Sequence, residues 1–302
     1  MAKSQKHLFQ LIVDRTDVVC MDEAHQFKAD VTSMVVNKLV NTKWRTGTTG
    51  TMQEAKVNKL QLIGMMSEPY DVITTKELMD QNSIVKLDIR MLVIKYPEYI
   101  RREMNGMDYK QEIDYLVTNQ ARNNMIAEIA KNCKGTTLIL FNFVHKHGAV
   151  LYDILQKIIP SNRKVVFIHG GVDVNDREAV RQLADTEEDI IIIASSSIFS
   201  TGTNIPSIEN VIFAMPTKST IRVRQSIGRG LRLRNGKTKC TLFDVSDDLS
   251  YKSYTNTTLN HMRLRAEIYT KEQFDFKITN IPLVEVKSTV LTDLAIDDGP
   301  PW

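Results

Sequence analysis

Short apolar runs alternate with segments of helical spacing along most of this chain. Apolar runs bounded by polar turns are typical of buried strands, whereas apolar residues that recur every three to four positions are typical of helices. This alternation predicts an α/β fold in which helices cover parallel sheets. In the second half, strands are expected at 87–94, 136–141, 164–168, 190–194, 210–214 and 239–245, and helices at 148–159, 176–184, 220–227 and 259–269.

The first 85 residues show the same alternation on a smaller scale. The pattern predicts a helix at 1–13, a short buried strand at 17–21, a helix at 30–41, a strand that begins at Trp44 and a helix at 53–66. Thr74 is placed to cap a short helix that ends at Met79. Farther along, 97–110 is expected to be a polar loop and 109–132 one long helix.

The expected strand at 17–21 runs directly into two carboxylates, Asp22 and Glu23. Functional groups in α/β proteins gather at the carboxyl ends of parallel strands. An exposed acidic turn would be the commoner explanation of these residues alone. The apolar strand before them favours a site.

A second stretch with chemical content is Gln225–Arg232. If it is helical, Arg229 and Arg232 lie on one face, because they are three positions apart. Arginine suits bidentate contact with phosphate and stays charged at any working pH. Between Thr217 and Lys239 there are eight lysines or arginines and no acidic residue. A solvated basic helix is the ordinary interpretation of such a cluster, but the segments upstream argue for more.

Together these stretches resemble the motifs of superfamily 2 helicases. Asp22–His25 reads Asp-Glu-Ala-His, similar to motif II in its DEAH form. Gln225–Arg232 matches each fixed position of motif VI, Gln-x-x-Gly-Arg-x-x-Arg. The resemblance implies RecA-like domains, ATP as substrate and Mg²⁺ as its metal ion. One RecA-like domain would be complete and one partial.

The resemblance also implies roles for these residues. Asp22 and Glu23 would hold Mg²⁺, and Glu23 would deprotonate the attacking water. Arg229 and Arg232 would bind ATP and stabilise charge on the transferring phosphoryl group as arginine fingers. Residues with an implied coupling role are His25, Thr49, Gly50, Thr51 and Gln225, of which Thr49-Gly-Thr51 aligns with motif III.

Three more segments match the family in order. Leu140–His145 occupies the position of motif IV, His169-Gly170 with Arg177 matches a His-Gly…Arg element, and Ala194–Asn204 matches motif V. Gly202 and Asn204 are expected to face ATP. The expected nucleic-acid contacts are Phe143, His169, Gly170 and Ser195. Taken singly, each hydroxyl cluster is more ordinarily a helix cap, and a Gly/Thr turn would look like motif III.

The P-loop of this family, Gly-x-x-x-x-Gly-Lys-Ser/Thr, is missing from the 302 residues. Gly236-Lys-Thr238 is the one Gly-Lys-Thr, and its spacing and its place after motif VI indicate a turn. Three explanations stay open: a fragment of a longer product, half of a split helicase whose partner polypeptide carries the P-loop, or a degenerate nucleic-acid-binding remnant.

Within the family, the residues of motifs V and VI resemble those of phage recombination DNA helicases. This likeness implies an ATP-dependent DNA helicase or translocase that remodels branched DNA, or junctions of duplex and single strands, in recombination and fork processing. An RNA helicase is the alternative, because the motifs concern ATP chemistry and not the sugar. We expect residues 1–85 to be the C-terminal part of the first RecA-like domain and 86–283 to be the second.

Composition changes this picture little. The charged fraction is 25% and the net charge +3, which permits nucleic acid as a partner without requiring it. Cys20, Cys133 and Cys240 lack metal-ligand spacing and are typical of reduced thiols in a cytoplasmic protein, here the host cytoplasm if a phage encodes it. No apolar run approaches the ~20 residues of a membrane helix. Residues 284–302 are expected to form an acidic, disordered tail, with docking on a basic partner as the alternative.

Overall fold

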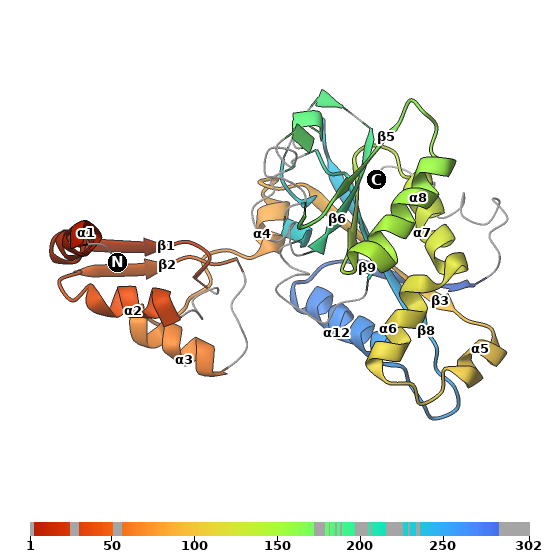
Figure 1. Cartoon of the computed structure of the whole chain (residues 1–302), viewed down its shortest axis with the longest axis horizontal. Helices are drawn as coiled ribbons and strands as arrows, with labels where there is room; N and C mark the ends of the chain where they lie inside the picture. Colours follow the sequence, from red (N-terminus) through yellow and green to blue (C-terminus); the bar gives the residue numbers. More distant parts are fainter. Residues whose placement is uncertain are drawn as a thin grey trace. The chain divides into compact units, whose positions relative to one another are not determined.

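The computed structural model describes residues 3–24, 30–50, 56–171, 179–180, 182–184, 186–187, 189–196, 205, 207–215, 226–228, 230–233 and 236–283. Its contacts divide the chain into two compact units, Met1–Val72 and Ile73–Trp302. Figure 1 labels the helices and strands of both units.

The smaller unit is a two-stranded parallel sheet with helices. Its elements are α1 (Lys3–Arg15), β1 (Val18–Met21), α2 (Asp30–Lys38), β2 (Trp44–Gly47) and α3 (Lys56–Met65). Strand β1 pairs with β2 in the register Val18↔Trp44 to Met21↔Gly47. A small core contains Ala24, Val36 and Leu62.

The prediction that β1 is buried is wrong for the described residues. Val18 is 54% exposed and Trp44, its partner on β2, is 72% exposed. The apolar sequence of β1 does specify a strand, but burial depends on the neighbours that cover it. A sheet of only two strands buries few side chains unless helices or further strands pack on its faces.

The larger unit is built on a seven-stranded parallel sheet in the order β5-β6-β4-β7-β8-β3-β9. Its strands are β3 (Lys86–Lys95), β4 (Thr137–Phe141), β5 (Lys164–Ile168), β6 (Ile190–Ser195), β7 (Asn210–Phe213), β8 (Lys239–Asp248) and β9 (Phe276–Pro282). Its named helices are α4 (Thr75–Asp80), α5 (Glu98–Glu103), α6 (Tyr109–Thr118), α7 (Gln120–Asn132), the π-helical turn η2 (Val144–Gly148), α8 (Ala149–Ile158) and α12 (Thr257–Lys271). The predicted α/β class is therefore confirmed.

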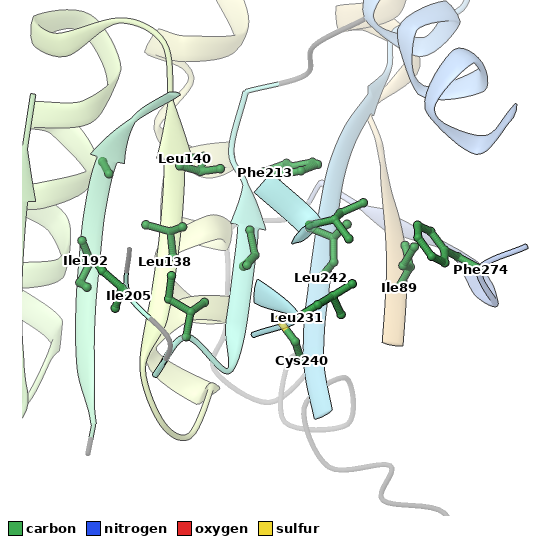
Figure 2. Packing of buried hydrophobic residues seen from close by; sticks show 14 of the residues in the cluster. Ile89, Leu138, Leu140, Ile192, Ile205, Phe213, Leu231, Cys240, Leu242 and Phe274 are labelled. Atoms are coloured by element: carbon green, nitrogen blue, oxygen red, sulfur yellow. The ribbon is translucent and has the colours of Figure 1, made fainter. Parts of the chain in front are cut away.

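Alternate residues of the strands enter two separate cores, one on each face of the sheet. On β4, Leu138 and Leu140 point to one core, and Ile139 and Phe141 point to the other. The first core also receives residues from α4 and α12, and the second receives residues from α6, α7 and α8. Figure 2 shows the first core, where labelled residues of β3, β4, β6, β7 and β8 lie on one face of the sheet.

Ion pairs are buried beside this sheet. Arg122 of α7 donates to both carboxylate oxygens of Asp247, at 2.8 and 3.0 Å, and Tyr96 also donates to Asp247. Arg265 of α12 pairs in the same way with Asp244. All four charged side chains are fully buried, so each depends on its partner for compensation.

Three predictions in this unit are wrong in detail. Residues 98–103 form α5 instead of a loop, and Arg101 of that helix donates to the carbonyl of Ser250. The expected long helix is two helices, because Asn119 leaves the helical conformation and its side chain caps α7 at the amide of Arg122. Strand β9 was not predicted at all.

The contacts divide the chain between Val72 and Ile73, ahead of α4. Helix α4 groups with the larger unit, and its Met79 and the following Val85 pack in the first core. Thr74 and Glu77 form a capping box at its start, so the predicted threonine cap is confirmed. Among the described helices, none is long and apolar enough to cross a membrane.

Candidate functional site

The carboxylate of Asp22 follows β1 and is held by two hydrogen bonds. The amide of Glu23 donates to Asp22 Oδ1 at 2.9 Å, and Thr48 Oγ1 donates to the same oxygen at 3.1 Å. Glu23 has a φ of 51°, in the left-handed region that a side chain adopts only when its surroundings require it. The backbone therefore turns sharply at the two carboxylates, and both side chains stay exposed.

Thr48 joins the ends of β1 and β2. Its amide donates to the carbonyl of Met21 at 2.8 Å, and its carbonyl accepts from the amide of Ala24 at 2.9 Å. A Cβ on Gly47 would lie 3.0 Å from Cβ of Ala24, so a larger residue would push the two loops apart. This interlocking fixes Asp22 relative to the loop after β2.

The contact with Thr48 was missed by the sequence reasoning, which placed the coupling at Thr49, Gly50 and Thr51. Thr49 and Gly50 lie one and two residues past the contact, and Thr51 and His25 lie outside the described residues. Adjacent threonines are indistinguishable in a motif. The strand register decides which hydroxyl faces the carboxylate, and the pairing of Met21 with Gly47 selects Thr48.

The donor set at this turn suits Mg²⁺. Two exposed carboxylates offer hard oxygen ligands, and Mg²⁺ commonly keeps several waters while using one or two carboxylates and substrate phosphates. No group of three or more possible metal ligands occurs among the described residues, as a fully protein-coordinated ion would need. Asp22 and Glu23 thus fit a metal ion shared with a phosphate.

A second group of predicted residues meets at one edge of the larger sheet. Phe141 of β4 pairs with Ser195 of β6, and Ile168 of β5 pairs with Ala194 of β6. The three neighbouring strands therefore end together, and Ser196 Oγ donates to the carbonyl of Phe141 at 3.0 Å. The structure therefore brings the segments of Phe143, His169, Gly170 and Ser195 to one carboxyl edge of the sheet.

Side chains at this edge differ in exposure. Ser195 is 4% exposed, so its hydroxyl lies beneath the surface, whereas Phe143 is 40% exposed. The ring of His169 lies 5.0 Å from the ring of Phe167, and its Nδ1 accepts from the amide of Gly171. That bond places the proton of a neutral His169 on Nε2 and leaves Nε2 as a donor.

The π-helical turn η2 follows Phe143 and shapes the same edge. At the end of this turn, the amide of Gly148 donates to the carbonyl of Phe143 at 2.9 Å. A Cβ on Gly148 would lie 2.6 Å from the ring of Phe141, so this close approach requires glycine. The turn exposes His145 and Lys146 and buries His147 completely. His145 ends the motif IV segment and Lys146 follows it, so both are candidate contacts beside Phe143.

Motif VI is described at residues 226–228 and 230–233. Residues 226–228 and Gly230 are helical, Leu231 is buried and the side chain of Arg232 is exposed. Gln225, Arg229, Gly202 and Asn204 lie outside the described residues, so their predicted roles stay predictions.

Comparisons with known proteins bear on this geometry. The family model "Helicase conserved C-terminal domain" matches residues 120–234. The "ATP-dependent DNA helicase uvsW" of Enterobacteria phage T4 is 29% identical over 275 residues, covering 87% of this chain and 54% of that protein. The crystal structure of T4 UvsW covers 91% of this chain and 57% of its own, with a TM-score of 0.57 and 25% identity. Residues 120–234 are therefore similar to a helicase C-terminal domain, and most of the chain is similar to a phage DNA helicase.

Two solved structures at lower identity show the same fold. The restriction-modification enzyme LlaBIII bound to DNA gives a TM-score of 0.61 at 14% identity, covering 92% of this chain and 22% of its own. Dbp5 of S. cerevisiae bound to RNA and ADP BeF3 gives a TM-score of 0.53 at 13% identity, covering 96% of this chain and 66% of its own. The chain spans about half the length of UvsW, so the activity of a whole helicase does not transfer to it by similarity alone.

Proposed function

We propose that this chain supplies the water-activating carboxylates, the arginine fingers and part of the nucleic-acid grip of an ATP-dependent DNA helicase. The observation that carries the proposal is the turn after β1, where Thr48 and the amide of Glu23 orient Asp22. The similarity to a phage DNA helicase supports DNA as the nucleic acid. Branched DNA, in recombination and fork processing, is the proposed substrate.

Mg²⁺ bound at Asp22 and Glu23 would neutralise phosphate charge and polarise the phosphoryl group. Glu23 accepts a proton from the attacking water, and Asp22 is oriented by its two donors. Arg229 and Arg232 are assigned to the charge that develops on the transferring phosphoryl oxygens. The proposal gives His25, Thr49, Gly50, Thr51 and Gln225 the coupling of hydrolysis to movement, and Gly202 and Asn204 contact with ATP.

The grip on DNA is assigned to the carboxyl edge of the larger sheet. There Phe143 offers an aromatic face, His169 offers an Nε2 donor, and Lys146 offers a charge that Asp114 partly offsets at 2.9 Å. Contacts of this kind go mainly to phosphates and sugars and are therefore tolerant of sequence and sensitive to salt. Gly170 and Ser195 complete the proposed set.

In this proposal the P-loop is supplied from outside these 302 residues, on another segment or another polypeptide. The exposed pair Val18 and Trp44 supports this part of the proposal, because β1 and β2 present apolar sheet that such a segment would cover. The division into a partial domain at 1–85 and a complete domain at 86–283 is part of the same proposal.

DNA-stimulated ATP hydrolysis by the purified chain, with and without a P-loop-bearing segment, tests the proposal. Glu23→Gln should abolish hydrolysis and leave ATP binding intact, and Arg229→Ala should lower turnover by roughly 10³. Thr48→Val is a matched variant that removes one donor to Asp22 and should lower turnover less. Hydrolysis by Glu23→Gln at the parent rate would show that the motif II assignment is wrong.

Binding measurements separate the alternatives. Tight DNA binding without hydrolysis in either mixture would indicate the non-catalytic remnant. Competition between DNA and RNA of matched sequence should favour DNA, and a preference for RNA would contradict the proposed substrate.

A further inference from the structure

The Gly236-Lys-Thr238 segment, which is not a P-loop, has a definite place in the structure. Gly236 has a φ of 82°, and the chain turns there between motif VI and β8. The turn brings the side chain of Lys237 back towards motif VI. Lys237 Nζ donates to the carbonyl of Gly230 at 2.5 Å and to the carbonyl of Arg232 at 3.2 Å.

The carbonyl between these two is also bound. The amide of Val85, at the entrance to β3, donates to the carbonyl of Leu231 at 3.0 Å. Three consecutive carbonyls at the end of the motif VI helix therefore each accept a hydrogen bond, two of them from one ammonium group. A cation at the C-terminus of a helix also interacts favourably with the helix dipole.

Packing fixes the same segment from the side of the sheet. A Cβ on Gly230 would lie 2.7 Å from Sγ of Cys240, so the backbone of Gly230 packs against the beginning of strand β8. Leu231 is 1% exposed in the first core, where Figure 2 shows it beside Cys240. Burial raises the pKa of the Cys240 thiol to about 12, so this neighbour is a neutral packing group.

From these contacts we propose that Lys237 is a positioning residue for Arg232. It acts through the backbone: residues 230–232 are held at three carbonyls and one buried side chain, while the guanidinium of Arg232 extends into solvent. The inference rests on the proposed function, in which Arg232 stabilises phosphoryl charge. A misplacement of about 1 Å in a catalytic group can cost roughly 10² in rate, so a fixed base for Arg232 has catalytic value.

The test compares Lys237→Met with Lys237→Arg in the ATP-hydrolysing assembly. Lys237→Met keeps the aliphatic stem and removes the donor. We expect kcat to fall by about 10- to 100-fold while the KM for ATP changes by less than about 3-fold. Lys237→Arg can donate to both carbonyls and should restore kcat to within about 3-fold of the parent. Lys86→Met, an exposed lysine next to Val85, is the matched control and should match the parent.

A purely structural lysine would give a different result. The melting temperature would then fall with kcat and KM moving together, or kcat would stay within 2-fold of the parent, and either result would overturn the proposal. Failure of Lys237→Arg to restore kcat would also overturn it.

Amide hydrogen exchange on the purified chain provides a measurement that needs no ATP hydrolysis. In Lys237→Met, the amides of Val85 and Leu231 should exchange at least about 10-fold faster, with little change in the remainder of the sheet. Unchanged exchange at both amides would show that Lys237 does not hold this segment. Arg232→Ala distinguishes failure of the proposed function from failure of the inference about Lys237. If Arg232→Ala hydrolyses ATP like the parent, Arg232 has no catalytic role, and a positioning role for Lys237 fails with it.

Discussion

Strands β1 and β7 have similar lengths and similarly apolar sequences but opposite environments. β7 (Asn210–Phe213) is buried at every position, between β4 and β8 and under helices on both faces. β1 (Val18–Met21) alternates between exposed and half-buried positions and pairs with β2. The comparison shows that a local sequence can specify a strand without specifying whether it is buried.

The same difference extends to charge. In the larger unit Arg122 and Asp247 are fully buried, whereas in the smaller unit Lys43 and Asp17 pair at 2.9 Å in solvent. Arg122→Met should destabilise the larger unit by about 3–5 kcal/mol, because it leaves Asp247 buried without its charge partner. Lys43→Met should have no measurable effect. Urea unfolding monitored by circular dichroism measures both, and equal effects would contradict the contrast.

Apolar truncation makes a second test of the contrast. Ile212→Ala on β7 should cost about 3 kcal/mol, because it leaves a cavity in a fully buried site. Val18→Ala on β1 should change the stability of this chain little. If a P-loop-bearing segment covers the exposed sheet, the cost of Val18→Ala should rise when that segment is present, and an unchanged cost would argue against the covering.

Acid should destabilise the larger unit through His147. Burial, reinforced by the charge of Arg122, lowers the pKa of His147 to about 3. The unfolded chain therefore binds a proton between about pH 6.5 and pH 3 that the folded chain does not, and stability falls as the pH drops through this window. At pH 5 the loss is about 2 kcal/mol relative to pH 7.5.

His147→Phe should remove that part of the pH dependence, measured as the change in urea midpoint between pH 7.5 and pH 5. His7→Gln, at an exposed position on α1, is the control and should keep the parent's slope. The same slope in His147→Phe as in the parent would show that His147 is not the group responsible.

The smallest expected effect concerns the boundary between the units. Thr74→Ala removes the cap of α4 and should cost about 1 kcal/mol. Because Met79 of α4 packs in the first core, the cost should appear in the unfolding of the larger unit. Its appearance in the smaller unit instead would favour the boundary at 85.

These contrasts also separate what the sequence could predict from what it could not. Strands β4, β5, β6, β7 and β8 were predictable, because each is an apolar run bounded by polar turns. β9 was not, since an edge strand pairs on one side and its half-exposed sequence contains Asn280 and Pro282. The break at Asn119 depends on a side-chain cap that a periodic apolar pattern does not show.

The candidate site was predictable at a coarser level. The strand before Asp22 and the common edge of β4, β5 and β6 follow from apolar pattern and motif order. The choice of Thr48 over Thr49 depends on the register between β1 and β2, and the contacts of Lys237 depend on a turn at Gly236. Both are three-dimensional properties that the residue types and spacing of a motif do not specify.

The contact between Gly230 and Cys240 allows the reactivity of a native thiol to report the position of the end of motif VI. Cys240 and Cys133 are buried and Cys20 is exposed. If Cys20 is replaced, the alkylation rates of the other two thiols can be measured without its background. Because Gly230 packs on Sγ of Cys240, separation of the end of motif VI from β8 would admit a reagent to Cys240, whereas Cys133 lies in the other core and would react only when the sheet opens as a whole. The ratio of the two alkylation rates during ATP turnover would measure how often the end of motif VI separates from β8, without a reporter group attached beforehand.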